Sequence, residues 1–300
     1  MSSSRFKNIV WIVNSKIRSF KAFKKEISDA NFDPHENHKF LYTTHAGHAE
    51  ELALEACNHS DLIIAVGGDG TAFEVINGMM RSSEKPVLSI FPKGTANDFA
   101  RNFSLFPNFK NLLHALNFGV LFNLDVGEVH WPKHDKKRYF LNILDVGLGA
   151  EVVTRMNSGS RLFGAPLTYL WHITRALLTY KARTLTITIG ARNLSPTKTM
   201  SFVIANGAWF GNNLKIAPAA KTDDGFFNYT HLGDFSFLEY VTHVPAAKKG
   251  REILHRKINY GSGVSFQISG DADLEADGEW LGTLPVEVKC LPKSIKFLTF

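Results

Sequence analysis

The fold of this chain is decided by the stretch Leu62-Ile63-Ile64-Ala65-Val66-Gly67-Gly68-Asp69-Gly70-Thr71. Its first half is a continuous apolar run with no polar alternation, which predicts a strand buried on both faces of a parallel sheet. Residues 72–80 follow and are typical of a short helix. The glycines therefore stand at a strand-to-helix turn, where parallel sheets bind their ligands.

The residue types of this turn suit a phosphorylated ligand. Glycine lets the backbone approach a bulky anion with its N–H groups pointing at it, and the N-terminus of the following helix favours negative charge. Asp69 would repel bare phosphate, but it suits the Mg²⁺ carried by a nucleotide. The pattern is neither the P-loop nor the dinucleotide-binding fingerprint, and it is also compatible with a tight structural turn.

A second turn of the same kind follows within the next third of the chain. Val87–Phe91 is another apolar run, and it leads into Pro92-Lys93-Gly94-Thr95-Ala96-Asn97-Asp98-Phe99-Ala100-Arg101. Again a strand ends in a glycine, a hydroxyl group and polar residues before a helical segment. Two such turns predict neighbouring strands of one sheet, with both turns on the same edge.

Together these motifs resemble the diacylglycerol kinase catalytic-domain family, which includes bacterial diacylglycerol kinases, YegS-like lipid kinases, sphingosine kinases and ceramide kinases. The resemblance rests on Gly67–Thr71, on Glu74-Val75-Ile76-Asn77-Gly78 and on the run from Pro92 to Arg101. The first motif is shared with NAD kinases, whereas the second, at this spacing, is much more specific to the lipid kinases. The resemblance covers nearly the whole chain and implies ATP as phosphoryl donor.

The order of expected elements predicts two domains. Strands at 8–13, 40–44, 62–66, 87–91 and 122–127 alternate with helices, the first of which reaches about Ala30, so residues 1–126 form a nucleotide-binding α/β domain with an open parallel sheet. Residues 127–290 change to an antiparallel β-sandwich for the lipid substrate. The resemblance implies that the terminal strand, in residues 291–300, returns to the first domain.

The strands expected in the second domain lie at 139–144, 185–189, 199–205, 228–232, 264–269, 274–277 and 286–290. Leu185, Ile187 and Ile189 alternate with threonines, as in a sheet with one buried face. Helices are expected at 166–180 and 236–243. The first of them has an apolar side that suits either core packing or the wall of an acyl-chain cavity.

The resemblance places the nucleotide on the first domain. Asp69 is assigned to Mg²⁺–ATP, and Asp98 either contacts the nucleotide or orients its own turn through hydrogen bonds. The other nucleotide contacts that the resemblance implies are Thr43, Gly67, Gly68, Gly70, Thr71, Gly94, Thr95 and Asn97. Two departures from the family pattern stand out. The turn after residues 8–13 lacks the usual proline and glycine, and Phe73 replaces an amide, so that a ring able to stack on adenine takes the place of a hydrogen-bonding group.

The resemblance also places metal and acid–base chemistry on the second domain. It implies a Mg²⁺ site formed by Asp224 with the backbone carbonyls of Lys221 and Phe226, although Asp-Asp-Gly is by itself an ordinary turn. It further implies that Glu279 is the general base and that Asp277 belongs to the charge and metal network. Desolvation beside Trp280 would raise the pKa of a carboxylate there towards a value useful for a base.

A pair of histidines raises the question of a further metal site. His45 and His48 stand three residues apart at the start of an expected helix. Because the sequence offers no third ligand beside them, exposed or capping histidines are the more ordinary interpretation.

Composition limits the partners. The chain of 300 residues has 34 basic and 28 acidic residues, a net charge of +6 that is too diffuse to imply nucleic acid. Residues 1–7 have no apolar core of a signal peptide and no apolar run is long enough to span a bilayer, so we expect a cytoplasmic protein. A cluster of basic residues suits either a solvated face or peripheral contact with the inner face of a membrane. The cluster consists of Lys248, Lys249, Arg251, Arg256 and Lys257.

The sequence therefore predicts an ATP- and Mg²⁺-dependent lipid kinase whose acceptor is diacylglycerol or a related lipid alcohol. A homodimer is compatible with the sequence. Two other functions remain open: an NAD kinase-like small-molecule kinase, which the second motif disfavours, and a catalytically silent sensor of nucleotide or lipid, which the two departures in the first domain would suit.

Overall fold

The apolar runs of the first 126 residues form the expected parallel sheet. In the computed structural model, which describes residues 5–17, 20–29, 38–158, 165–211 and 213–300, the chain divides into two units. The first unit consists of Met1–Val126 and Pro292–Phe300, and the second of Gly127–Leu291. Residues 1–4 and Ala30, the expected end of the first helix, lie outside the described residues.

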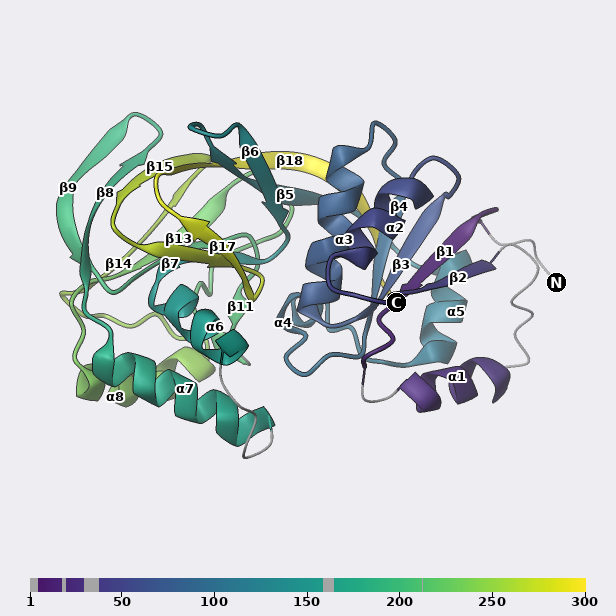
Figure 1. Cartoon of the computed structure of the whole chain (residues 1–300), viewed down its shortest axis with the longest axis horizontal. Coiled ribbons are helices and arrows are strands. Elements are labelled where there is room, and N and C mark those ends of the chain that lie inside the picture. Colours follow the sequence, from purple (N-terminus) through teal and green to yellow (C-terminus); the bar gives the residue numbers. More distant parts are fainter. Residues whose placement is uncertain (1–4, 18–19, 30–37, 159–164, 212) are drawn as a thin grey trace. The chain divides into compact units, whose positions relative to one another are not determined.

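Four parallel strands of the first unit lie in the order β2-β1-β3-β4 (Figure 1). Their bounds are β1 Ile9–Val13, β2 His38–Tyr42, β3 Leu62–Gly67 and β4 Val87–Pro92. The last strand of the chain, β18 (Val286–Leu298), runs from the second unit into the first and pairs in parallel with β4 at Phe297 and Leu88. The Ser89 hydroxyl donates to the Leu298 carbonyl at 2.9 Å, so the chain's end completes this sheet.

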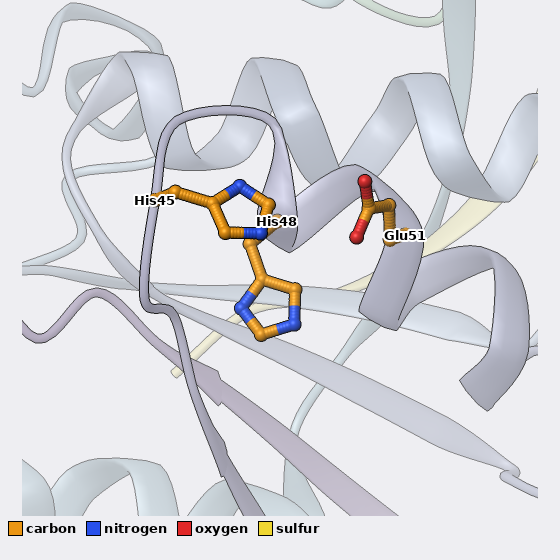
Figure 2. A group of neighbouring side chains, drawn as sticks. All are labelled: His45, His48 and Glu51. Carbon is orange, nitrogen blue, oxygen red and sulfur yellow. The ribbon is translucent and has the colours of Figure 1, made fainter.

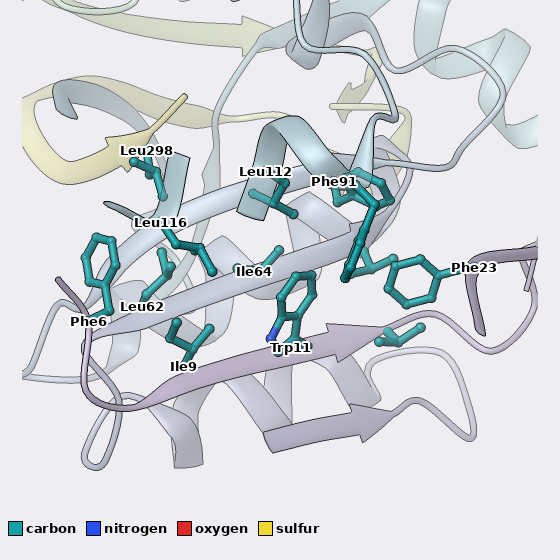
Figure 3. Packing of buried hydrophobic residues seen from close by; sticks show 13 residues of the cluster. Phe6, Ile9, Trp11, Phe23, Leu62, Ile64, Phe91, Leu112, Leu116 and Leu298 are labelled. Carbon is teal, nitrogen blue, oxygen red and sulfur yellow. The ribbon is translucent and has the colours of Figure 1, made fainter. Parts of the chain in front are cut away.

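The two faces of this sheet are covered by different helices. One face packs against α1 (Phe20–Asp29) and α5 (Phe109–Phe118) through a cluster that includes Trp11, Ile64 and Phe91 (Figure 3). Alternate strand residues are also buried and point to the opposite face, where α2 (His48–Ala56) and α3 (Asp69–Arg81) contact β1 and β3. Burial on both faces explains why these strands have no polar alternation.

The second unit is an antiparallel sandwich, as predicted. One sheet has the order β14-β13-β10-β7-β16-β17, and the other contains β18-β15-β8-β9. The rings of Phe202 and Tyr229 in the first sheet contact the ring of Phe266 in the second, with centroids 6.1 Å apart in both pairs. The predicted alternation of Leu185, Ile187 and Ile189 with exposed or half-buried threonines is confirmed.

The bounds of the remaining strands, of which β5 begins in the first unit and ends in the second, follow the sequence with some exceptions. They are β5 Leu121–Trp131, β6 Lys136–Phe140, β7 Ile143–Gly147, β8 Arg183–Ile189, β9 Arg192–Thr199, β10 Ser201–Ala205, β11 Trp209–Phe210, β12 Leu214–Lys215, β13 Phe227–Leu232, β14 Ile258–Gly263, β15 Ser265–Gly270, β16 Asp273–Ala276 and β17 Glu279–Thr283. The strand expected at 139–144 is divided, because Asp277 binds the backbone N–H groups of Leu141, Asn142 and Ile143 between β6 and β7.

The described part of the second unit contains three helices: α6 (Leu148–Ser158), α7 (Ala165–Thr179) and α8 (Phe237–Lys248). The sequence predicted α7 and the first half of α8 but not α6. Ser236 and Glu239 form a capping box that fixes the start of α8. Among the described residues, no helix has the length and apolar character needed to cross a bilayer.

Candidate active site

The two glycine turns of the first unit pack against each other backbone to backbone. A Cβ atom built on Gly94 would lie 2.3 Å from the Cα of Gly68, and one built on Gly68 would lie 2.9 Å from the Cα of Gly94. The N–H of Lys93 also donates to the carbonyl of Gly67 at 2.7 Å. Both turns lie on one sheet edge as predicted, and their close contact requires glycine whether or not a ligand is bound.

Helix α3 begins earlier than the sequence suggested. It starts at Asp69 rather than at Ala72, with Gly68 as its N-cap, so Gly70 and Thr71 lie in its first turn. The first N–H groups of a helix have no partner within the helix and carry its positive end. The expected glycine turn is therefore mostly a helix N-terminus, which strengthens its fit to an anion.

Asp69 occupies the first position of α3 and joins the two turns. Its Oδ1 accepts the N–H of Phe99, in α4 (Asp98–Arg101), at 3.1 Å. Burial raises the pKa of Asp69, the negative charge of Asp98 raises it further, and the Phe99 N–H offsets part of the shift. Asp98 is itself buried and lies 3.5 Å from the Arg101 guanidinium. Two carboxylates whose charges act on each other suit a cation bound beside them.

In the second turn, some of the predicted nucleotide contacts make structural hydrogen bonds and others are exposed to solvent. Asn97 has a left-handed backbone, with φ of 52°, and its side chain accepts the N–H of Gly94 at 2.9 Å and donates to the Gly94 carbonyl at 3.1 Å. Gly94 and Thr95 are exposed. Of this turn's predicted nucleotide contacts, Asn97 closes the turn, while Thr95 is presented to solvent.

A hydrogen-bonded group links the turn after β1 to the first glycine turn. The amide of Asn14 donates to Thr71 Oγ1 at 3.1 Å, while its oxygen accepts the N–H of Lys16 at 2.9 Å. Ser15 binds Thr43 through a backbone N–H donated to Thr43 Oγ1 and a hydroxyl donated to the Thr43 carbonyl. Asn14 was set aside at the sequence level because its turn lacks proline and glycine, although its place at a strand end was a usable signal.

Phe73 does not offer a ring for stacking. Its side chain is 3% exposed and belongs to the buried face of α3. The suggestion that this ring meets adenine is therefore wrong. The departure from the family pattern at this position is a packing feature.

In the second unit, the Asp-Gly-Glu hairpin joins β16 to β17. Asp277 has a left-handed backbone, with φ of 50°. Its carboxylate accepts three backbone N–H groups between 2.8 and 3.0 Å, from Leu141, Asn142 and Ile143. This arrangement fixes the hairpin against the start of β7, which is a structural task for a residue that the resemblance placed in the charge and metal network.

The desolvated carboxylates near this hairpin are not the predicted ones. Glu279 is exposed, so the predicted desolvation does not apply to it. Glu275 is fully buried, and burial together with the charge of Asp145 holds the pKa of Glu275 well above its usual range. Glu275 Oε2 accepts the N–H of Gly278 at 2.9 Å. Sequence reasoning missed this residue, although its place inside a strand, between Leu274 and Ala276, was a signal for it.

Asp145 lies opposite Glu275 across the β7–β16 pair. It is 1% exposed, and burial raises its pKa to about 6, with hydrogen bonds from Ser201 and Gly149 opposing the shift. Ser201 Oγ donates to Oδ1 at 2.5 Å and the Gly149 N–H donates to Oδ2 at 2.8 Å. The second unit thus holds a pair of buried acids directly beneath its hairpin.

The residues expected to bind Mg²⁺ lie in an exposed turn before β13. Lys221, Asp224 and Phe226 are all exposed, and Asp224 Oδ1 accepts the N–H of Phe226 at 3.1 Å. Gly225 has a φ of 79°, which lets the chain reverse there. A carboxylate and two carbonyl oxygens are hard donors that suit Mg²⁺, so the chemistry of this turn fits the ion.

Comparison with known proteins covers both units. Residues 9–129 match the family model of the diacylglycerol kinase catalytic domain, and residues 142–299 match that of the YegS C-terminal NAD kinase beta sandwich-like domain. The chain is 31% identical over 251 residues to the diacylglycerol kinase of Bacillus subtilis strain 168, covering 82% of this chain and 80% of that one. It is 28% identical over 282 residues to the diacylglycerol kinase of Staphylococcus aureus strain JH9, covering 91% and 86%.

Solved structures agree on the fold. A crystal structure of a diacylglycerol kinase from Bacillus anthracis strain Sterne superimposes with a TM-score of 0.73 at 21% identity, covering 99% of this chain and 98% of that one. The crystal structure of an NAD kinase from Archaeoglobus fulgidus in complex with ATP gives a TM-score of 0.53 at 12% identity, covering 97% and 93%. The fold expected from the glycine turns, of the NAD kinase and diacylglycerol kinase type, is confirmed.

Proposed function

Because the chain belongs to the diacylglycerol kinase family, we propose that it transfers the γ-phosphoryl group of ATP to a hydroxyl of diacylglycerol or a related lipid alcohol. The observation that carries this proposal is the joined pair of glycine turns at the carboxyl ends of β3 and β4. They bring the N-terminus of α3 and two acidic side chains, Asp69 and Asp98, to one sheet edge.

The first unit would bind the triphosphate. Phosphoryl transfer depends mainly on positioning and charge neutralisation. The N–H groups at the start of α3 offer donors and a positive partial charge for the phosphates, and Asp69, tied to Phe99, would face the accompanying cation. Asn14 orients Thr71, and Ser15 orients Thr43, so that both threonines hold fixed positions beside the ligand.

Mg²⁺ would be held by oxygen donors of this chain. Asp69 and Asp98 in the first unit, and Asp224 with the carbonyls of Lys221 and Phe226 in the second, supply hard ligands. When bound, Mg²⁺ neutralises phosphate charge as the β–γ bond breaks. Lys93 is not needed for that task, since its ammonium already pairs with Glu26 at 2.8 Å and is largely buried.

Glu279 is the residue we propose as general base. It is exposed at the start of β17 and follows a turn that Asp277 and Glu275 hold in place. Its carboxylate would accept the proton of the acceptor hydroxyl while the hydroxyl oxygen bonds to the γ-phosphorus. The bond from that phosphorus to the bridging oxygen breaks, and ADP leaves with the electron pair.

The lipid would be bound by the second unit. An open pocket of about 410 Å³ lies between the end of α7 and the start of α8, and its lining mixes apolar side chains, which suit an acyl chain, with polar ones such as Lys198 and Asp234. Its apolar lining includes Leu177, Leu178, Met200, Phe235 and Phe237. Leu178 and Phe237 are exposed, at 64% and 36%, so the pocket is accessible to a lipid from outside.

Peripheral contact with an anionic membrane would deliver this substrate. Exposed apolar side chains accompany the basic cluster in the sequence: Leu238 and Val241 on α8, and Leu254 between Arg251 and Arg256. Lys248, Lys249, Arg251 and Arg256 are exposed, whereas Lys257 forms an ion pair with Glu239 at 2.8 Å and is less available. We propose that the protein acts in the cytoplasm at the inner membrane face, bound by these groups.

Membrane binding can be tested by sedimentation with vesicles of neutral or anionic phospholipid. Each exposed lysine near an anionic surface contributes about 1 kcal/mol, so a Lys248→Glu/Lys249→Glu double variant should bind anionic vesicles at least tenfold more weakly. A Lys39→Glu/Lys110→Glu double variant, with exposed lysines of the first unit, is the control. If both double variants lose the same amount of vesicle binding, the effect is due to net charge alone and not to this cluster.

Activity is tested with labelled Mg–ATP, a panel of lipid alcohols, and NAD as a small-molecule acceptor. We expect a labelled lipid with wild type and none with Asp69→Ala. Glu279→Gln should keep ATP binding and lose roughly 10²- to 10⁴-fold in kcat, the range for a general base. Asp271→Asn, an exposed carboxylate of the second unit, is the control. Labelled NAD would favour the small-molecule kinase, and ATP binding without transfer would favour the sensor.

A further inference from the structure

Two histidines and a glutamate gather at the start of α2 (Figure 2). His45 lies in the turn after β2, His48 is the first residue of α2, and Glu51 stands three residues further along the helix. One ligand atom from each lies within 4.8 Å of the others. We propose that these three side chains bind a divalent transition-metal ion, with zinc as the best match.

The donor set decides the class of metal. Two imidazoles and one carboxylate are typical ligands of zinc, which leaves a fourth position for water. Mg²⁺ prefers oxygen donors alone, so the ion that accompanies ATP would not compete well here. At the sequence level the two histidines lacked a third ligand. The helix supplies it, because residues three apart on a helix lie on the same face.

The site requires a modest closure. Tetrahedral zinc with bonds of about 2.0–2.2 Å holds its ligand atoms roughly 3.3 Å apart, closer than the present limit of 4.8 Å. The two imidazole rings are stacked, with centroids 4.7 Å apart and planes 23° from parallel, so one ring must turn to aim its lone pair at a shared ion. His45 and Glu51 are exposed and His48 is half-buried, which gives His45 the room to turn.

The hydrogen bond of the His45 ring favours coordination through its Nε2, whereas His48 must change its tautomer to coordinate through Nε2. His45 Nδ1 lies 2.9 Å from the carbonyl oxygen of Ala46. Because a carbonyl only accepts, Nδ1 carries the proton and Nε2 keeps its lone pair. His48 Nδ1 accepts the N–H of Thr44 at 3.0 Å and lies 3.1 Å from Thr44 Oγ1. Because Nδ1 accepts that N–H, the neutral ring carries its proton on Nε2. Coordination through Nε2 therefore requires the proton to move to Nδ1, where it is donated to the Thr44 hydroxyl, and the hydrogen bond from the Thr44 N–H to break.

The local charge suits a cation despite the helix N-terminus. A helix start carries positive partial charge, which by itself disfavours a metal ion. Here the Glu74 carboxylate already accepts the N–H groups of Gly47 and Ala49, at 2.9 and 3.0 Å. Glu51 adds a second negative charge in the first turn of α2. The proposed site is independent of the kinase proposal, since neither ATP nor the acceptor is assigned to its ligands.

The test uses Co²⁺ as a coloured probe and Zn²⁺ as its competitor, with the full chain and no nucleotide. We expect wild type to bind one Co²⁺ whose visible absorption disappears on adding Zn²⁺ but persists in millimolar Mg²⁺. His45→Ala and Glu51→Gln should each weaken Co²⁺ binding roughly tenfold or more. His59→Ala is the matched control, because this exposed histidine follows the end of α2 and belongs to no three-ligand group among the described residues.

Circular dichroism of each variant separates loss of a ligand from loss of the fold. His48→Ala is a third variant, kept apart because its ring also holds Thr44. Wild-type affinity in His45→Ala and Glu51→Gln would overturn the proposal, as would an equal loss in His59→Ala. Displacement of Co²⁺ by Mg²⁺ as readily as by Zn²⁺ would also overturn it, since that behaviour belongs to a carboxylate site.

Discussion

The glycine turns of the first unit and the Asp-Gly-Glu hairpin of the second use the same residue types for different purposes. Gly68 and Gly94 are required because two backbones touch, whereas Gly278 has open space around its missing Cβ and a φ of 87°. Asp69 also accepts backbone hydrogen bonds, the Phe99 N–H among them, but the charge of a second acid, Asp98, raises its pKa. The Asp277 carboxylate accepts three N–H groups of the segment that leads into β7. A motif aspartate beside a glycine can therefore serve as a structural brace, as Asp277 does, and the sequence pattern alone does not reveal this.

The sharpest test of this comparison is Gly94→Ala against Gly278→Ala. The first substitution places a methyl group 2.3 Å from a backbone atom that cannot move without shifting the neighbouring turn. We expect it to lower the free energy of unfolding by roughly 3 kcal/mol or more and to abolish ATP binding. Gly278→Ala adds only the strain of a left-handed backbone, about 1 kcal/mol. Urea unfolding measures both, and equal losses would remove the distinction between contact and strain.

The buried acids beneath the hairpin predict a pH dependence. Burial raises the pKa of Asp145 from 3.8 to about 6, so the folded state holds this proton to higher pH than the unfolded chain. The contribution to stability is full below about pH 4 and falls as pH rises to about 6, by roughly 3 kcal/mol in total. Glu275 acts in the same direction, because its pKa is also raised.

Asp145→Asn should therefore gain stability relative to wild type as pH rises from 4 to 7, by up to about 3 kcal/mol. The amide oxygen can still accept the Gly149 N–H, which limits the cost of the substitution. Urea unfolding at several pH values measures the difference, with the exposed Asp271→Asn as control. A difference between Asp145→Asn and wild type that does not change with pH would show that Asp145 is charged throughout.

Substitutions of the two carboxylates of the hairpin motif should have different effects, one on stability and the other on turnover. Asp277→Asn keeps at most one acceptor oxygen for three backbone N–H groups, so we expect a loss of roughly 1–3 kcal/mol in unfolding free energy. Glu279→Gln changes an exposed side chain, so its free energy of unfolding should lie within about 0.5 kcal/mol of the wild-type value. Its turnover should nevertheless be lost. Thermal unfolding beside the labelled-ATP assay measures both, and similar destabilisation in the two variants would contradict the assignment of Asp277 as the brace.

Much of the first unit could be read from its sequence because burial on both faces leaves a clear pattern. The apolar runs ending at Val66 and Phe91 predicted two strands and the edge on which their turns lie, and the structure confirms both. The start of α3 was placed three residues late, since glycines usually indicate a turn. Here Gly70 lies within the first helical turn because Gly68 takes the cap position.

The second unit was harder to read because its decisive contacts join distant residues. Nothing local in Tyr139–Leu144 indicates that a carboxylate at Asp277 will divide this segment into two strands. Likewise, Phe73 gives no local sign of whether its ring faces a ligand or the core, and only the packing of α3 places it inside. Glu51 joins His45 and His48 only once the turn before α2 is folded.

The smallest predicted effect concerns Asn14, and it tests how the first unit differs from the hairpin. One carboxylate braces the hairpin, whereas the glycine turn is held by several single hydrogen bonds, of which Asn14 to Thr71 is one. Asn14→Ala should cost about 1 kcal/mol in unfolding free energy and raise the KM for ATP a few-fold with kcat nearly unchanged. A double-mutant cycle with Thr71→Val should give a coupling energy of about 1 kcal/mol. A coupling energy near zero would mean that Thr71 is positioned by helix α3 alone. The missing proline and glycine in the turn at Asn14 would then have no effect on function.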